Sequence, residues 1–165
     1  MKVFGLSGRS GSGKTSLMIR LVPWFKAQGL TISTVKQAHE GFDVDKKGKD
    51  SYEHREAGAS EVMIASARRW ALMHEYRDEP EYSMEQLLAR MSAVDLVLIE
   101  GFRKWPHQRL EVWRQETGKP PVYLEDDNVV ALVSDRPVPD CSLPQLGIDD
   151  TDAIGRLILS RVGLS

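Results

Sequence analysis

The stretch GLSGRSGSGKTSL, residues 5–17, decides the fold of this chain. From Gly8 to Thr15 it matches the pattern G-x-x-x-x-G-K-[ST] at every fixed position. An apolar run precedes it at residues 3–6, and apolar residues at helical spacing follow it at 17, 21, 24 and 25. A bare backbone between a strand and a helix lets phosphate oxygens approach the amides, so residues 8–15, the glycine loop, are predicted to bind phosphate.

The glycine loop also predicts roles for its side chains. We expect Lys14 to neutralise the β- and γ-phosphates of a nucleotide and the Thr15 hydroxyl to ligate Mg²⁺. A glycine-rich turn that only joins a strand to a helix is the alternative, and the flanking apolar segments favour nucleotide binding. The residues expected to contact the nucleotide are Gly8, Ser10, Gly11, Ser12, Gly13, Lys14, Thr15 and Ser16.

Strand and helix patterns alternate through the rest of the chain. The clearest strand is 94–100, whose consecutive aliphatic residues indicate burial on both faces, as in a central parallel strand. The alternation predicts an α/β, three-layer P-loop NTPase fold in one domain, 1–165, with a mainly parallel central sheet flanked by helices and a β-hairpin extension. The other expected strands are 30–35, 110–114 and 129–133, the hairpin strands are 61–67 and 70–76, and the expected helices are 15–28, 51–58, 84–92 and 150–162.

Two carboxylates, Asp95 and Glu100, flank the predicted central strand. Five residues of extended strand separate them by roughly 16 Å, so only one can lie at the end where the ligands of open α/β sheets collect. Glu100 follows the aliphatic run and precedes Gly101, which places it at the carboxyl end. We therefore predict Glu100 as a metal and catalytic residue and Asp95 as a solvated strand entry.

Asp50 allows two interpretations. The sequence DSYE at 50–53 has the form of a capping box, which would account for Asp50 as a helix cap. The polar loop before it also supplies Asp43 and Asp45, and loops of this length in compact domains are usually functional or mobile. An active-site role for at least one of these three aspartates stays open at this point. The weaker candidates nearby are Lys36 and His39.

The composition excludes several classes of function. Lys and Arg total 22 against 24 Asp and Glu, a formal charge of −2, so general attraction to nucleic acid or to an anionic membrane is not expected. A single cysteine, Cys141, excludes an internal disulfide framework and a multi-cysteine metal cage. No apolar run approaches the roughly 20 residues that span a bilayer, and no signal-peptide layout begins the chain. We expect a cytoplasmic protein without nucleic-acid or membrane partners.

Four segments together resemble the molybdopterin-guanine dinucleotide biosynthesis protein B family. They are GRSGSGKTSL, TVKQAHEGFDVDKKGKDSYEHREAGA, DLVLIEGFRK and a late VALVSD. The first motif occurs in very many nucleotide-binding proteins, whereas FDVDKKGKDS and LIEGFRK are much more specific to this family. The resemblance runs from Val3 to about Leu159.

This resemblance implies a small GTP-binding protein of the P-loop class that includes dethiobiotin synthetase-like enzymes and metal-delivery GTPases. It implies a homodimer with sheets joined across the dimer and slow GTP hydrolysis. The implied role is to assist the guanylyltransferase that attaches GMP to molybdopterin, and molybdopterin itself is a possible ligand. It further implies that Asp50 is a catalytic residue that ligates magnesium or contacts the phosphate end, and it supports Glu100 as the acidic residue after the central strand.

The base-reading residue is less clearly marked. No N-K-x-D element is present, and Asp135 in Val133-Ser134-Asp135 stands where a base-reading loop is expected and could accept from a guanine ring. Arg103 and Lys104 could contact the pterin phosphate or the partner enzyme, although a solvated loop is an equal alternative.

Three other functions compete with this interpretation. A small-molecule kinase that uses ATP would need an acceptor pocket and often has a mobile arginine-bearing lid, for which Arg68 and Arg69 are the candidates. A metallochaperone GTPase would need a metal segment rich in histidine or cysteine, which the sequence lacks. A purely structural module is disfavoured by the complete glycine loop.

Overall fold

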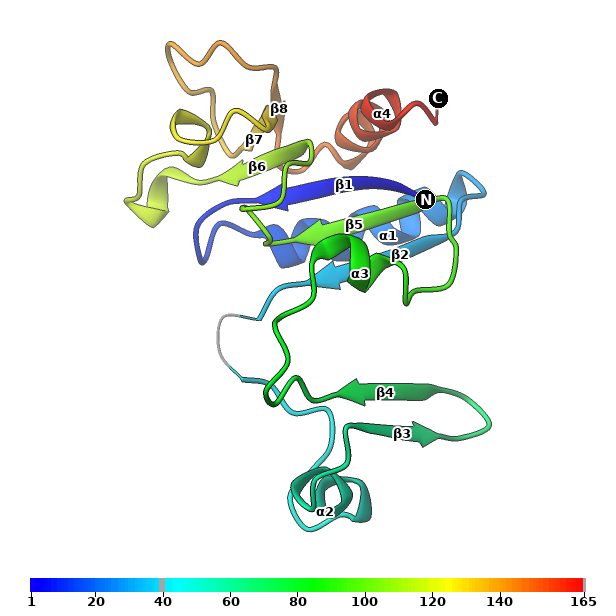
Figure 1. The fold of residues 1–165 in the computed structure, drawn as a ribbon. Coiled ribbons are helices and arrows are strands. Elements are labelled where there is room, and N and C mark those ends of the chain that lie inside the picture. Colours follow the sequence, from blue (N-terminus) through cyan, green and yellow to red (C-terminus); the bar gives the residue numbers. More distant parts are fainter. Residues whose placement is uncertain (39–40, 165) are drawn as a thin grey trace. The chain divides into compact units, whose positions relative to one another are not determined.

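The computed structural model describes residues 1–38 and 41–164, which fall into two compact units. The sheet unit comprises residues 1–37 together with residues 91 to the C-terminus, and the hairpin unit comprises residues 38–90 (Figure 1). The expectation of a single domain over 1–165 stays a prediction. In the described part of the chain, no helix combines the length and the apolarity that crossing a bilayer requires.

A six-stranded parallel sheet forms the centre of the sheet unit, with strand order β2-β5-β1-β6-β7-β8. Strand β5 lies between β1 and β2, and its four aliphatic residues are fully buried, as a central parallel strand requires. Because all strands run the same way, their carboxyl ends share one edge of the sheet. The strands are β1 (Lys2–Ser7), β2 (Ile32–Lys36), β5 (Leu96–Glu100), β6 (Arg109–Trp113), β7 (Val129–Ser134) and β8 (Gln145–Gly147).

Helices α1 (Lys14–Ala27) and α4 (Thr151–Val162) pack against each other and against this sheet. Gly155 permits their close approach, because a Cβ at this position would collide with the ring of Trp24. The arrangement confirms the expected α/β fold with a mainly parallel central sheet and helices. The core combines Phe4, Leu6, Leu17, Leu21, Phe25, Leu96, Leu98, Leu110, Val112, Ala131, Val133, Ile148, Ile154 and Ile158.

The hairpin unit contains the predicted antiparallel pair, β3 (Glu61–Ala65) and β4 (Trp70–His74). Helix α2 (Asp50–Glu56) packs against β3, and α3 (Met84–Leu88) follows the hairpin. Ser83 caps α3 as part of a complete capping box with Gln86. The β-hairpin extension is therefore confirmed.

Of the two interpretations of Asp50, the one as a helix cap is wrong. Helix α2 begins at Asp50 itself, its N-cap is Lys49 in an extended conformation, and no side chain caps the helix. The helix starts one residue earlier than the motif requires, so Asp50 is its first residue. Its carboxylate has no capping role.

The segment after β6 departs most from the sequence pattern. Two short 3₁₀ helices, η1 (Gln115–Thr117) and η2 (Val122–Leu124), follow β6, and the edge strand β8 was not predicted. The carboxylate of Glu111, which is fully buried in β6, accepts hydrogen bonds from the amides of Val122 and Tyr123 at 2.7 and 2.8 Å. This buried acceptor fixes η2 to the sheet.

Candidate functional site

The glycine loop leaves the carboxyl end of β1 and enters α1. Gly8, Gly11 and Gly13 all have positive φ values, of 138°, 83° and 101°, in a region that other residues adopt only with strain. A Cβ on Gly8 would also collide with the carbonyl oxygen of Val112 in β6. The glycines therefore allow the loop both its conformation and its close contact with the neighbouring strand.

Lys14 folds back over this loop. Its ammonium group donates to the carbonyl oxygens of Gly8 at 2.9 Å and Arg9 at 3.0 Å. Partial burial lowers the pKa of Lys14, the Glu100 carboxylate opposes that decrease, and Lys36 adds to it. Among the described residues, the hydrogen-bond acceptors of this half-buried cation are neutral carbonyls, so it gains by meeting an anion, which suits a phosphate ligand.

The amino end of α1 offers further donors. Its N-cap is Gly13, no side chain in the described part of the chain caps its amino end, and no acidic residue lies in its first turn. The Ser12 hydroxyl is buried without a hydrogen-bond partner among the described residues. Uncapped amides and an unsatisfied hydroxyl beside a lysine fit the binding of nucleotide phosphates.

Glu100 lies where the sequence places it, at the carboxyl end of β5. It pairs in register with Leu6 of β1 and with Lys36 of β2, so it stands next to the strand that leads into the glycine loop. Its side chain is 15% exposed and accepts a hydrogen bond from the Lys36 ammonium at 3.2 Å. The sheet thus brings Lys14, Lys36 and Glu100 to one edge. Lys36, a weak candidate from sequence, belongs to this constellation.

Asp95 lies at the opposite end of β5 and has a structural role. Its carboxylate accepts from the amide and the hydroxyl of Thr31 at 2.8 and 2.6 Å, and its own amide donates to that hydroxyl. The hydrogen bonds from the Thr31 side chain and amide lower the pKa of Asp95. The strand-entry assignment agrees with this position, and the exchange of hydrogen bonds ties the start of β5 to the residue before β2.

Asp135 follows β7 at the same carboxyl edge and is exposed. Its neighbour Ser134 accepts a hydrogen bond from the amide of Ile148 at 2.9 Å, so the segment after β8 runs beside it. Ile148 in turn lies near Gly13, since a Cβ built on Gly13 would be 3.6 Å from the Cδ1 atom of Ile148. Ile148 therefore lies next to both the Asp135 segment, through its backbone amide, and the glycine loop, through its side chain.

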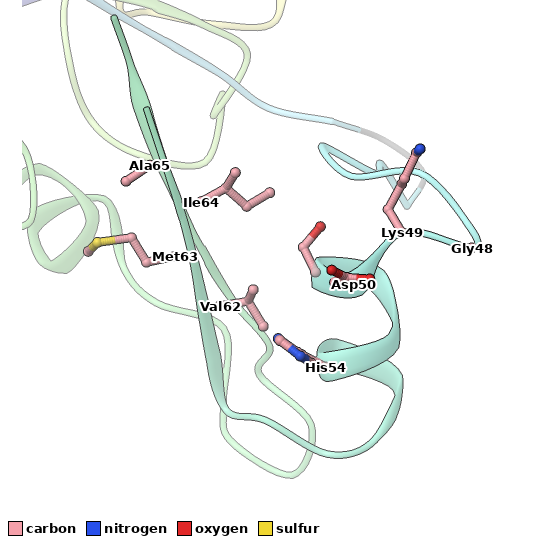
Figure 2. A pocket seen from close by; sticks show the side chains of 9 residues that line it. Gly48, Lys49, Asp50, His54, Val62, Met63, Ile64 and Ala65 are labelled. Carbon is pink, nitrogen blue, oxygen red and sulfur yellow. The ribbon is translucent and has the colours of Figure 1, made fainter. Parts of the chain in front are cut away.

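Asp50 belongs to the hairpin unit and lines a hollow of about 580 Å³. Figure 2 shows Asp50 in the first turn of α2, with Val62 and Ile64 of β3 pointing toward that helix. The hollow has polar residues on one side and β3 on the other. The predicted role of Asp50 as a metal or phosphate-end ligand stays a prediction. The lining residues are Gly48, Lys49, Asp50, Ser51, His54, Val62, Met63, Ile64 and Ala65.

Asp43 and Asp45, the other aspartates of the loop, are engaged by Arg55. The Arg55 guanidinium contacts Asp43 at 3.0 Å and Asp45 at 3.1 Å, and the Asp45 side chain is only 1% exposed. Hydrogen bonding to Asp45 is the largest cause that raises the pKa of Arg55. Both aspartates therefore fasten the loop to α2, a role that the sequence analysis missed. The candidate His39 lies outside the described residues.

A parallel sheet that delivers a glycine loop, a lysine and an acidic residue to one edge defines a P-loop protein of the α/β class. Residues 3–135 match the family described as MobB, molybdopterin guanine dinucleotide synthesis protein B. The chain belongs to this family.

Two relatives are similar over most of their length. The molybdopterin-guanine dinucleotide biosynthesis adapter protein of Escherichia coli (strain K12) is 39% identical over 91% of this chain and 87% of its own. The protein of the same name from Haemophilus influenzae is 38% identical over 82% of this chain and 76% of its own. These similarities support the same family assignment.

Solved structures of the family share the fold. Bacillus subtilis MobB superimposes with a TM-score of 0.76 at 24% identity over 98% of both chains. The MobB homologue of Bacillus stearothermophilus gives a TM-score of 0.72 at 21% identity over 100% of both chains. The agreement confirms the overall P-loop fold expected from the glycine loop.

Proposed function

We propose that the chain is a GTP-binding accessory protein with weak GTPase activity in molybdenum cofactor biosynthesis. In this role it assists a guanylyltransferase in converting molybdopterin to molybdopterin guanine dinucleotide. The relatives named as adapter proteins of this biosynthesis support the pathway. The observation that carries the nucleotide part is the Lys14 ammonium, which is held over a glycine loop whose helix has an uncapped amino end.

Each residue has a part in this proposal. The amides of the glycine loop and of α1 donate to the nucleotide phosphates, and Lys14 neutralises their charge. Thr15, Glu100 and Asp50 are the proposed magnesium ligands, and the bound ion would neutralise phosphate charge during hydrolysis. Glu100 is the acidic group that the sheet positions beside the loop. Asp50 rests on the family resemblance alone.

The nucleotide preference is tested by calorimetric titration with GTP and then ATP, each with and without Mg²⁺. We expect magnesium-dependent binding selective for GTP, with Asp135 accepting from the guanine ring. Lys14→Ala should retain the fold and lose roughly 100-fold in GTP affinity, as expected when one charged partner of a phosphate is removed. Unchanged affinity in Lys14→Ala would refute the assignment of the glycine loop.

A preference for ATP would favour the small-molecule kinase. The candidate lid arginines, Arg68 and Arg69, lie in the exposed turn between β3 and β4, where the Ser66 hydroxyl accepts from both of their amides. Rapid phosphate transfer to an added acceptor, lost in Arg68→Gln, would then replace the accessory role.

The choice of Glu100 over Asp95 is tested by a matched pair of variants. Glu100→Gln should lower magnesium-dependent GTP hydrolysis about tenfold or more with a smaller change in GTP affinity. Asp95→Asn removes a carboxylate from the other end of the same strand, so both quantities should stay at the wild-type level. Equal losses of hydrolysis in the two variants would show that the strand-end assignment is incorrect.

The outer face of the hairpin supports the homodimer. Met63 pairs with Leu72 and Ala65 with Trp70, so these side chains share the face opposite Val62 and Ile64. On this face Met63, Leu72 and Trp70 are 62%, 44% and 64% exposed. A two-stranded sheet that presents large apolar side chains gains by pairing with a second copy.

Ultracentrifugation should give twice the chain mass of 18.6 kDa. Trp70→Ser combined with Leu72→Ser should shift the protein to monomer. Leu124→Ser is the matched control, because Leu124 is 66% exposed but lies outside the hairpin. A wild-type monomer would remove the dimer from the proposal.

The partner role is tested with a purified guanylyltransferase of the pathway and molybdopterin. Addition of the chain with GTP should raise the yield of the dinucleotide, and Lys14→Ala should not. An equal yield of the dinucleotide with and without the chain would reject the accessory role, whether or not the chain binds GTP.

A further inference from the structure

Two arginines beside the glycine loop share one carboxylate. Arg9, within the loop, contacts Glu125 at 3.5 Å, and Arg103, just after β5, contacts the same Oε2 atom at 4.0 Å. The side chains of Arg9, Arg103 and Glu125 are 29%, 42% and 57% exposed. These distances describe loose charge pairs and not the close two-bond contact that a guanidinium makes with a well-matched anion.

The nearby acidic residue, Asp126, already has a closer partner. Its carboxylate lies 3.4 Å from the Arg109 guanidinium, with exposed fractions of 8% and 1%, whereas its distance to Arg103 is 4.0 Å. Asp126 and Arg109 thus neutralise each other in the interior. In the part of the chain that the structure describes, Glu125 is the carboxylate that lies within 4.0 Å of both partly exposed arginines, while the buried Glu111 interacts with both electrostatically.

Each member of this cluster is held by its own part of the fold. Arg103 follows Gly101 and Phe102, whose φ values are 96° and 51°, and the Phe102 amide donates to the side chain of Gln37 at 2.7 Å. A bulky residue in the left-handed region carries strain, which accumulates at functional sites. Glu125 directly follows η2, which the buried Glu111 fixes to β6. Three distant segments therefore converge on one charged cluster.

We propose that Arg9 and Arg103 form a second anion site that binds a phosphate monoester, with Glu125 occupying the place of that phosphate when the site is free. The inference rests on the proposed function in one respect, since there the monoester is the phosphate of the pterin ligand. The site adjoins the glycine loop through Arg9. It brings the phosphate of a second ligand next to the nucleotide phosphates.

The test is a titration with phenyl phosphate of protein saturated with a non-hydrolysable GTP analogue. Arg103→Gln should weaken phenyl phosphate binding about fivefold or more, and Arg103→Lys should bind at an intermediate level because it keeps the charge but loses the planar fork. Glu125→Gln should strengthen binding about threefold, since the competing carboxylate is removed. Arg161→Gln, the same charge change at an exposed position of α4, should remain within twofold of wild type.

Two results would overturn the second site. One is equal binding in Arg103→Gln and wild type. The other is loss of phenyl phosphate binding in the analogue-saturated protein although the nucleotide-free protein binds it, which would place the probe in the glycine loop. Failure of the analogue itself to bind would count against the proposed function and not against this site. The titration is then repeated in Lys14→Ala, whose glycine loop competes less, and the same order of variants is expected.

Discussion

The two units of the chain are held together by different forces. The sheet unit surrounds a continuous apolar core, in which Phe4, Leu98 and Ile158 are completely buried. The hairpin unit has two buried hydrophobic residues in its described part, Val62 and Met84, while large apolar side chains of its strands are exposed. Buried apolar area is the main source of stability in the sheet unit, whereas charge pairs and an exposed apolar face characterise the hairpin unit.

This difference separates the two tasks that the proposed function requires. Phosphate binding needs donors fixed to a fraction of an ångström, and the glycine loop obtains this from the core beneath β1 and α1. Association with another chain needs an accessible apolar face, which the hairpin supplies at Met63, Trp70 and Leu72. Substitutions in the sheet unit should therefore affect global stability, and substitutions in the hairpin unit should affect local order and assembly.

The largest effect is expected from Leu98→Ala in β5. Leu98 is fully buried in the core of the sheet unit, so its truncation should lower the free energy of unfolding by about 3 kcal/mol through lost burial and a residual cavity. Urea denaturation followed by circular dichroism measures this change. The matched control is Val44→Ala in the hairpin unit, because Val44 is 55% exposed and its truncation should cost less than about 1 kcal/mol. Similar losses would mean that the two units do not differ in this way.

A second expected effect is a pH dependence specific to the sheet unit. Burial is the main cause that lowers the pKa of His107 to about 4, and the nearby Arg109 guanidinium adds to it. In the unfolded chain the pKa of His107 is 6.5, so between about pH 4 and 6.5 this residue is more protonated in the unfolded state than in the folded state. The free energy of unfolding should therefore rise with pH across this window and level off above it.

Comparison with His107→Asn isolates this contribution from the carboxylates. The His107 ring lies against β1, since a Cβ on Gly5 would be 2.5 Å from its Nε2 atom, and its Nδ1 lies 2.9 Å from the Trp105 carbonyl. Between pH 7.5 and 4.5 the wild type should lose about 2 kcal/mol more than the variant. Parallel stability curves for the two proteins would contradict a neutral, buried His107.

Much of the sheet unit follows from local sequence patterns. The glycine loop, the aliphatic run of β5 and the position of Glu100 after it are each encoded within about ten residues, and the structure places all three as expected. The same local logic separated Glu100 from Asp95, which lies at the other end of the strand and binds Thr31. Short-range signals suffice where the residues that define a feature lie within a few positions of one another in the chain.

The missed features depend on contacts between distant residues. Strand β8 has only three residues and no readable alternation, and it forms because β7 supplies a partner. The role of Glu111 requires amides 11 and 12 residues away, and the pairing of Arg9 with Glu125 spans 116 positions. The error at Asp50 was local, since a one-residue shift of the helix start turned an expected cap into the first helical residue.

In the hairpin unit, Arg55→Met should release the loop that precedes α2. The variant removes the guanidinium that holds Asp43 and the buried Asp45, leaving the latter without its ion-pair partner. Hydrogen exchange measured by mass spectrometry should show about tenfold faster exchange for amides of residues 41–57, with β1 and β5 unchanged. The double variant Arg55→Met with Asp45→Asn should recover part of the protection, because no buried charge remains unpaired. Faster exchange throughout the sheet unit as well would contradict the conclusion that the two units are stabilised independently.

The smallest effect is expected at the edge where the nucleotide site is proposed. Lys36 is 66% exposed and donates to Glu100 at 3.2 Å, so it competes with any cation that approaches this carboxylate. It also contributes to the lowered pKa of the Lys14 ammonium. Lys36→Met should therefore raise the apparent magnesium affinity of the GTP complex by about threefold, the scale of one exposed ion pair, while leaving stability nearly unchanged. Magnesium titrations of GTP hydrolysis measure the affinity, with Lys26→Met in the last turn of α1 as the control. A weaker magnesium affinity in Lys36→Met would mean that Lys36 helps to bind the phosphates and does not compete with Mg²⁺ for the Glu100 carboxylate.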